Sequence, residues 1–194
     1  QKTAQVGVIG LGYVGLPVAC MVANEGFRVL GVDLKKDRVD LINQGVSPIE
    51  GKEPGLSDLL AKVVNEGSFR ATTDYQELTD ADIVLIDVET PTDENHIPQY
   101  VALRSACNSL GAVLRNGALV IVESTIAPGT MEKVVRQILE SSSGKKSSHD
   151  FYLGACPERV MPGKLLSNLR NMSRVCGGET PETAQVMKLF YSNI

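Results

Sequence analysis

A glycine-rich run near the start of the chain decides how the rest is read: residues 6–17 are VGVIGLGYVGLP. Small and apolar residues typical of a buried strand lead into glycines spaced G-x-G-x-x-G, at Gly10, Gly12 and Gly15, and a helical pattern follows. In such a unit the first glycine permits a tight turn, the second lets the backbone approach a pyrophosphate, and the third lets the helix pack close to the strand. The exposed amides at the start of that helix favour phosphate groups. The run therefore predicts a phosphate-binding turn.

A carboxylate at the end of the next β-rich run indicates the ligand class. Asp33 closes RVLGVD, 18 residues beyond Gly15, where a carboxylate can accept hydrogen bonds from both hydroxyls of an adenine ribose. Because a carboxylate there would repel a 2′-phosphate, we predict NAD rather than NADP. Lys35, Lys36 and Arg38 leave an alternative open, since basic side chains beside the acid could hold NADP; otherwise they are solvated residues of the following helix.

Short β-rich runs alternate with helical patterns along the whole chain. Apolar runs without strict polar alternation indicate a parallel sheet that helices cover on both sides. We therefore predict an α/β fold with a doubly wound, mainly parallel Rossmann-type sheet, formed by residues 1–194 as one NAD-binding domain. The expected strands are QVGVI, RVLGVD, FRATT, DIVLID, ALVIVE, FYLGA and SRVCGG, and the expected helices cover residues 16–25, 35–43, 56–66, 101–114 and 131–140. Gly26 should end the first helix, and Pro128 and Pro181 should begin later ones.

Polar residues at strand ends are candidate site residues, because ligands bind beyond the carboxyl ends of strands in open parallel sheets. Thr90 follows DIVLID and Thr125 follows ALVIVE, and both can offer hydroxyls to a ribose or a nicotinamide. The alternative is that these threonines satisfy the amides of turns and helix starts. Glu158 and Arg159 follow FYLGA, where a carboxylate facing the cleft could hold a water molecule or assist proton movement. An exposed Glu158–Arg159 ion pair of no functional consequence is the alternative there.

Composition argues against several classes of protein. Hydrophobic residues make up 43% of the 194 residues and charged residues 22%, and no apolar run approaches the roughly 20 residues of a membrane helix. We therefore expect a soluble, cytoplasmic protein without a membrane partner. A net charge of −4 gives no basic footprint for nucleic acid.

The cysteines are widely scattered and show no C-x-x-C spacing, so we expect reduced thiols and neither a disulfide nor a metal site. Cys20 and Cys107 fall within helical patterns, Cys176 falls in the last expected strand, and Cys156 precedes Pro157. Residues 141–148, SSSGKKSS, are expected to form a flexible surface loop because they have no apolar face to bury.

Four motifs, in this order across nearly the whole chain, carry a family resemblance: VIGLGYVGLPVA, TPTDEN, VESTIAPGT and CPERVMPG. Together they resemble the amino-terminal, NAD-binding domain of the UDP-glucose/GDP-mannose dehydrogenase family. SPIEGKEPGLSDLL at 47–60 and the P-E-R-V-x-P-G form of the last motif are most similar to the members that act on UDP-N-acetyl-D-mannosamine. Relatives acting on UDP-glucose typically carry P-E-F-L-R-E-G there, so Pro162 stands where they have a second acid, and that acid's role does not carry over.

The resemblance implies a reaction and a set of residue roles. Such enzymes remove two hydrides from the C6 hydroxymethyl group of a nucleotide sugar, passing through an aldehyde level and a cysteine thioester, with two NAD consumed. Glu158 and Thr125 would lie beside the reacting carbon, and Arg159 and Val160 would begin the loop along the UDP-sugar. By motif position, the further contacts with NAD would come from Tyr13, Val14, Asp33, Arg38, Thr90 and Thr125.

The resemblance also implies what this chain lacks. The family's catalytic cysteine lies in a later domain, its oxyanion-stabilising lysine and asparagine lie beyond residue 194, and a central helix joins two subunits. The final segment, PETAQVMKLFYSNI, reads as a helix with apolar residues still arriving at its end. We therefore expect the amino-terminal part of a longer, homodimeric enzyme, which by itself binds NAD without oxidising a sugar.

Alternatives remain open. UDP-N-acetylglucosamine or UDP-glucose could be the sugar substrate. β-Hydroxyacid dehydrogenases share the G-x-G-x-x-G start and a Ser-Thr-x-x-Pro element, although CPERVMPG argues against that group. The chain could also be a non-catalytic NAD-sensing or partner-binding module.

Overall fold

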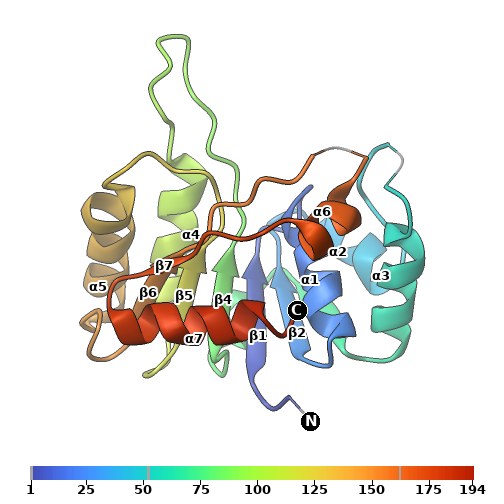
Figure 1. Ribbon diagram of the computed structural model, residues 1–194, viewed down its shortest axis with the longest axis horizontal. Coiled ribbons are helices and arrows are strands. Elements are labelled where there is room, and N and C mark those ends of the chain that lie inside the picture. The colour runs from blue at the N-terminus through green and yellow to red at the C-terminus, as the bar shows by residue number, and fades with distance from the viewer. Residues whose placement is uncertain (1, 52, 162) are drawn as a thin grey trace.

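The computed structural model describes residues 2–51, 53–161 and 163–194. Within these residues one sheet contains β1 (Gln5–Ile9), β2 (Arg28–Val32), β3 (Phe69–Thr72), β4 (Ile83–Ile86), β5 (Leu119–Val122), β6 (Tyr152–Ala155) and β7 (Gly177–Gly178). The strand order is β3-β2-β1-β4-β5-β6-β7 (Figure 1). Strands β1 to β6 are parallel, and the short β7 runs antiparallel to β6. The predicted doubly wound α/β fold is confirmed.

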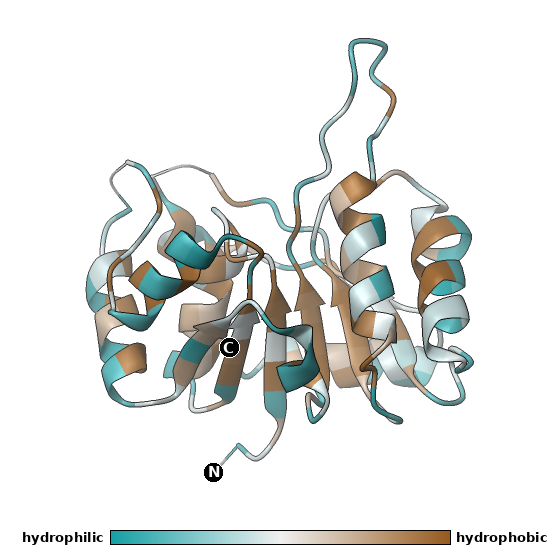
Figure 2. Cartoon of the chain, turned by 180° about the vertical axis from the view of Figure 1, so that it is seen from behind, coloured by the Kyte–Doolittle hydropathy of each residue, from teal (hydrophilic) through white to brown (hydrophobic). Residues whose placement is uncertain are grey.

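Helices cover both faces of the sheet. One face packs against α1 (Gly15–Asn24), α2 (Lys36–Asn43), α3 (Leu56–Asn65), α6 (Leu165–Asn171) and α7 (Pro181–Tyr191). The other face packs against the 3-10 turn η1 (Tyr75–Leu78), α4 (Val101–Gly111), the π-helical η2 (Met131–Arg136) and α5 (Gln137–Ser143). Figure 2 shows the molecule from behind, with hydrophobic strands in the centre and hydrophobic stripes on the helices. None of the described helices combines the length and hydropathy of a membrane span.

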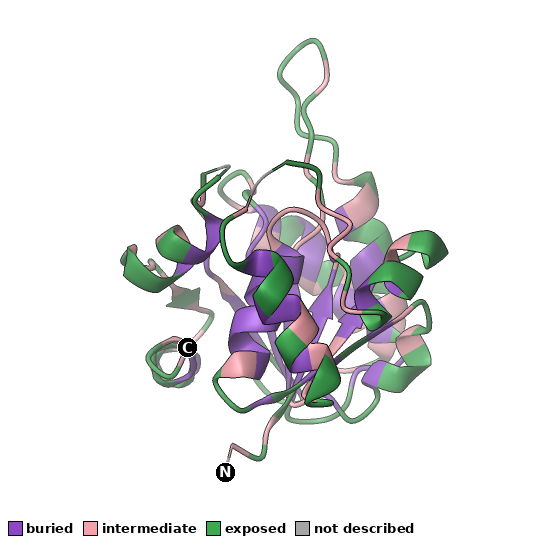
Figure 3. Cartoon of the chain, turned by 90° about the vertical axis from the view of Figure 1, so that its right-hand side faces the viewer, coloured by how far each residue is buried: buried purple, intermediate pink, exposed green. Residues whose placement is uncertain are grey.

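The apolar runs form strands because each contributes side chains to two hydrophobic cores, one on each face of the sheet. In β4, Ile83 and Leu85 belong to the core under α1, whereas Val84 and Ile86 belong to the core under α4. Successive side chains of a strand point to opposite faces, so a strand buried on both faces needs an unbroken apolar run. Figure 3 shows the result as buried strands enclosed by helices whose outer faces are exposed.

The helix ends follow local chemistry. Gly26 has a φ of +91° directly after α1, as expected for a glycine that ends a helix, and Pro181 begins α7. Pro128 lies three residues before the start of η2.

Three details differ from the sequence expectation. Residues 141–143 are helical rather than loop. The hydroxyls of Ser142 and Ser143 donate to carbonyls one turn earlier instead of competing with the helix, and Gly144 ends the helix at a φ of +70°. Cys176 lies just before β7, which is only two residues long. The helix α6 and the turn η1 were not expected.

Candidate functional site

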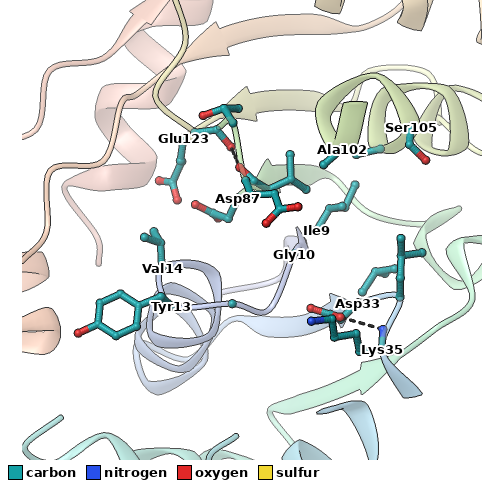
Figure 4. A pocket seen from close by; sticks show the side chains of 18 of the residues that line it. Ile9, Gly10, Tyr13, Val14, Asp33, Lys35, Asp87, Ala102, Ser105 and Glu123 are labelled. Atoms are coloured by element: carbon teal, nitrogen blue, oxygen red, sulfur yellow. Dashed lines mark hydrogen bonds between the residues drawn. The ribbon is translucent and has the colours of Figure 1, made fainter. Parts of the chain in front are cut away.

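A cleft of about 570 Å³ lies at the carboxyl ends of β1, β2, β4 and β5. Figure 4 shows Gly10 in the middle of this cleft, with Asp33 and Lys35 on one side and Asp87 and Glu123 on the other. The predicted site residues that line it are Gly10, Gly12, Tyr13, Val14, Asp33, Arg38, Thr90, Thr125 and Glu158. The strand-end rule thus places residues far apart in sequence around one space.

The glycine turn has the geometry that the spacing predicts. Gly10 has a φ of +91°, which a side chain would strain. A Cβ on Gly15 would lie 1.9 Å from the carbonyl oxygen of Gly10, so only glycine allows α1 to approach β1 this closely. A Cβ on Gly12 would meet nothing within 4 Å, which leaves free space in front of its backbone. Among the described residues no side chain caps the start of α1, so its first amides can bind an anion.

Asp33 connects three parts of the cleft. Its carboxylate accepts hydrogen bonds from the Leu11 N–H at 3.0 Å, the Lys35 N–H at 2.9 Å and the Arg38 guanidinium at 2.9 Å. Only 7% of Asp33 is exposed, whereas the Arg38 side chain remains 28% exposed beside it. The acid therefore fixes the end of β2 against the glycine turn and holds Arg38 at the rim of the cleft.

The basic residues after Asp33 do not behave alike. The Lys36 ammonium pairs with Asp40 at 2.7 Å on the surface of α2, so Lys36 is a solvated residue of this helix rather than part of the cleft. Lys35 and Arg38 line the cleft. Because Arg38 is paired with Asp33, its charge is already balanced by a carboxylate.

The loops after β4 and β5 are joined by hydroxyl groups. The Thr90 hydroxyl donates to the carbonyl of Thr125 at 2.8 Å, and the Ser124 hydroxyl donates to the carbonyl of Val88 at 2.7 Å. The Thr90 hydroxyl therefore bonds to a backbone group of a neighbouring loop, as in the alternative interpretation of this threonine, and Thr90 also lines the cleft. The contacts of Thr90 and Thr125 with a cofactor stay predictions.

Carboxyl groups follow three adjacent strands at the other end of the cleft. Asp87, Glu123 and Glu158 come after β4, β5 and β6 respectively, and all three line the cleft. The Arg174 guanidinium lies 2.8 Å from Glu158 Oε2 and 3.2 Å from Glu123 Oε1. The Tyr191 hydroxyl donates to Glu123 Oε1 at 2.7 Å. One guanidinium is thus shared by two carboxylates.

Burial strongly affects two of these acids. Both carboxyl oxygens of Asp87, and Glu123 Oε2, are inaccessible to solvent and have no hydrogen-bond partner among the described residues. Loss of solvation, followed by the negative charge of Glu123, raises the pKa of Asp87 well above its usual range. Loss of solvation also raises the pKa of Glu123, although Arg174 and Tyr191 oppose the shift.

The side chains of Arg159 and Val160 do not join this group of acids. The Arg159 backbone N–H donates to Glu158 Oε1 at 2.7 Å, but its guanidinium donates to the Ser173 carbonyl. Glu158 is therefore paired with Arg174 rather than with the side chain of Arg159. Val160 is partly buried against the core under α1, and neither residue is among the described residues that line the cleft. Their contact with a UDP-sugar stays a prediction.

Comparison with known proteins identifies the family. The model of the UDP-glucose/GDP-mannose dehydrogenase family, NAD binding domain, matches residues 4–194. The chain belongs to this family. Its cofactor is NAD, as the glycine spacing and Asp33 predicted.

Relatives show how much of a family enzyme this chain represents. It is 37% identical over 187 residues to UDP-N-acetyl-D-mannosamine dehydrogenase of Pyrococcus horikoshii, and the aligned region covers 96% of this chain and 44% of that protein. It is 42% identical over 158 residues to GDP-mannose 6-dehydrogenase of Pseudomonas syringae, covering 79% of the chain and 36% of that protein. The crystal structure of NDP-N-acetyl-D-galactosaminuronic acid dehydrogenase from Methanosarcina mazei superimposes with a TM-score of 0.94 at 38% identity, covering 98% of this chain and 42% of the other. The chain spans less than half the length of these relatives.

The residues of the cleft fit the cofactor of the family. Gly12 leaves room for a pyrophosphate, the uncapped start of α1 offers amides to it, and the Asp33 carboxylate lies at the cleft wall where a ribose can be bound. Among the described residues no group of three or more His, Cys, Asp or Glu side chains is arranged to hold a metal ion.

Sequence reasoning missed several residues of the site. Asp87 and Glu123 are the last residues of DIVLID and ALVIVE, the same position that Asp33 has in RVLGVD, so the strand-end rule could have found them. Arg174 and Tyr191 come from distant segments and had no local signal.

Glu53 was also missed. It accepts hydrogen bonds from the Tyr13 hydroxyl and from the backbone N–H groups of Gly163 and Leu165, the latter at 3.2 Å. Although partial desolvation opposes ionisation, these hydrogen bonds lower the pKa of Glu53. Glu53 thus ties the glycine turn to the loop that follows Glu158.

Proposed function

We propose that this chain is the NAD-binding part of a nucleotide-sugar 6-dehydrogenase that oxidises UDP-N-acetyl-D-mannosamine to the uronate by two successive hydride transfers. The observation that carries this proposal is a single cleft with Asp33 at one end, the glycine turn in its middle and Glu158 with Thr125 among its walls. The relative from Pyrococcus horikoshii, named for the same substrate, supports the choice of sugar. The GDP-mannose and NDP-N-acetyl-D-galactosaminuronic acid enzymes support the wider class of nucleotide sugars.

Bound NAD supplies the hydride acceptor, and the chain supplies its binding. The amides at the start of α1 and the open backbone of Gly12 bind the pyrophosphate. Asp33 accepts hydrogen bonds from the adenine ribose, and Arg38, held by Asp33, lies beside it. Tyr13 and Val14, from the same turn, also line the cleft.

Glu158 acts at the reacting carbon in this proposal. Arg174 and the Arg159 N–H each occupy one of its two carboxylate oxygens, and each oxygen keeps a second acceptor position. A carboxylate held in this way can orient a water molecule or accept a proton, and such assistance is typically worth about 100- to 10,000-fold in rate. Thr125 lies on the same side of the cleft, and Arg159 and Val160 begin the loop that we assign to the UDP-sugar.

The nucleophilic cysteine is not among those of this chain in the proposal. Burial raises the pKa of Cys20 and Cys107 to about 12 and that of Cys156 to about 11, so these thiols stay protonated near neutral pH. Cys176 lies just before β7 and is not among the described residues that line the cleft. We therefore place the cysteine in a further segment of a longer, homodimeric cytoplasmic enzyme, and expect this chain alone to bind NAD without producing NADH.

Two assays test the proposal. Calorimetric titration of the 194-residue chain should show binding of NAD⁺ in preference to NADP⁺, and mixtures of the chain, NAD⁺ and UDP-sugars should produce no NADH. The longer protein should then be assayed against UDP-N-acetylmannosamine, UDP-N-acetylglucosamine, UDP-glucose and GDP-mannose, with NADH counted per sugar. Two NADH per UDP-N-acetylmannosamine is the expected result. Turnover by the 194-residue chain would contradict the assignment of the nucleophile, and binding without turnover in the longer protein would favour a sensing module.

A further inference from the structure

Taken over the residues that the structure describes, the charges at the far end of the cleft do not balance. Asp87, Glu123 and Glu158 face one guanidinium, that of Arg174, which contacts the latter two. The carboxyl oxygens of Asp87 and Glu123 Oε2 have neither solvent nor a described hydrogen-bond partner. An uncompensated buried carboxylate costs several kcal/mol, so such a group keeps a proton instead.

A shared proton resolves the missing hydrogen bond. Ile86 and Val122 are paired across the neighbouring parallel strands β4 and β5, so Asp87 and Glu123, the next residue after each, lie side by side. A protonated Asp87 can then donate to the Glu123 carboxylate, which a pair of ionised groups cannot do. Two carboxyl groups this close lose their protons in two separate steps that belong to the pair. The pair therefore carries one proton and one negative charge.

This pair is part of the cleft wall. Both residues line the cleft, on the side of Gly10 opposite Asp33 (Figure 4). With the adenine ribose at Asp33 and the pyrophosphate at the glycine turn, the second half of a dinucleotide extends toward the ends of β4, β5 and β6. In the oxidised dinucleotide that half ends in a positively charged ring, and in the reduced form the ring is neutral.

We propose that Asp87 and Glu123 share one proton in the free chain, and that entry of the cationic ring of the oxidised dinucleotide expels this proton to solvent. The Asp87 O–H bond breaks, the proton leaves as a solvent proton, and the second carboxylate then balances the charge of the ring. The neutral ring of the reduced dinucleotide has no such effect. This inference rests on the proposed function, because it requires the dinucleotide to lie in the cleft.

The other charged and titratable groups around the pair come from three segments. Glu158 adds negative charge from the end of β6, and Arg174, before β7, opposes it. Tyr191 from α7 donates to Glu123, and the neighbouring Cys156 thiol is neutral because burial raises its pKa to about 11. Among the described residues, Asp87 has neither an ion pair nor a hydrogen-bond donor, so it is the group that gains most from an incoming cation.

Proton counting by calorimetry tests the inference on the 194-residue chain. Binding enthalpies of NAD⁺, NADH and ADP-ribose are measured at the same neutral pH in two buffers of different ionisation enthalpy. NAD⁺ should release more protons than NADH or ADP-ribose, by up to one per site. The affinity for NAD⁺ should also rise relative to that for NADH as pH increases, by at most about tenfold per pH unit.

Two variants and a control complete the test. Asp87→Asn and, separately, Glu123→Gln should abolish the difference in proton release between NAD⁺ and NADH. Asp82→Asn, which removes an acid paired with Arg115 at the opposite end of β4, should leave the difference unchanged. Equal proton release with NAD⁺ and NADH in the wild-type chain would overturn this inference but not the proposed function. The same would follow if both variants kept the wild-type difference in proton release between NAD⁺ and NADH. Failure of all three ligands to bind would overturn the proposed function and this inference with it.

Discussion

Replacement of Asp33 by asparagine is the sharpest test of the adenosine end of the cleft. The carboxylate of Asp33 accepts three hydrogen bonds in the structure, from the Leu11 N–H, the Lys35 N–H and the Arg38 guanidinium. An asparagine keeps one acceptor oxygen but turns an NH₂ group toward a donor, and it offers a neutral acceptor to the ribose. Losing one partner of a hydrogen bond to a charged group costs about 1–3 kcal/mol. We therefore expect NAD⁺ affinity to fall by about 5- to 150-fold, at 1.4 kcal/mol per tenfold change.

Calorimetric titration of Asp33→Asn with NAD⁺ and NADP⁺ measures this effect. Discrimination against NADP⁺ should shrink, because the negative charge that repels a 2′-phosphate is gone. Asp40→Asn is a matched control, since the one partner of Asp40 among the described residues is the exposed Lys36 on the same helix, and Asp40 does not line the cleft. Thermal melts of both variants verify that each is folded at the titration temperature. Wild-type affinity for NAD⁺ in Asp33→Asn would refute the placement of the ribose.

Other predictions concern the glycine turn, the buried pair and the loop contact. Gly12→Ala should leave the free energy of unfolding within about 0.5 kcal/mol of wild type yet weaken NAD⁺ binding, because its Cβ enters open space that the pyrophosphate needs. Gly15→Ala should instead lower the free energy of unfolding by about 1–3 kcal/mol or more, because its Cβ clashes with Gly10. Urea denaturation measures the two stabilities, and calorimetric titration measures NAD⁺ binding. Because the pKa of Asp87 is raised in the folded state, the native state binds more protons than the unfolded state at any pH between the unfolded-state and folded-state pKa values of this group. The free energy of unfolding of the wild type should therefore fall as pH rises through that window. If Asp87→Asn showed the same dependence of unfolding free energy on pH, the prediction would be contradicted. Glu53→Gln should speed hydrogen exchange at the amide of Leu165, the first residue of α6, and unchanged exchange would show that the contact is dispensable.

The sheet was predictable because each strand carries its own signal. A parallel strand covered on both faces must be apolar throughout, and ALVIVE, for example, contains a strand that is buried at all four positions. The helix α6 gave no comparable signal, since it has seven residues and no side-chain cap at its start. The serines at 141–143 were predicted to be loop because they offer no apolar face to bury, yet here the hydroxyls of Ser142 and Ser143 bond back to the helix itself.

The site was predictable only as far as local spacing reached. Glycine spacing and the strand-end position placed Asp33, Thr125 and Glu158 in one cleft. The partners of the acids were beyond such reasoning, because Arg174 lies 51 residues and Tyr191 68 residues from Glu123. Such contacts depend on how the segment after β6 folds back over the sheet. That segment also carries the pairing of Glu158 with Arg174, and this pairing takes the place of the surface pair with Arg159 that was the alternative interpretation.

The most direct test of the account is a crystal structure of the chain grown with NAD⁺. We expect the adenine ribose hydroxyls on the Asp33 carboxylate, the pyrophosphate over the backbone of Gly12, and the nicotinamide ring beside Glu123 and Glu158. A dinucleotide bound at another edge of the sheet, or one lying reversed with its adenine beside Glu158, would contradict it.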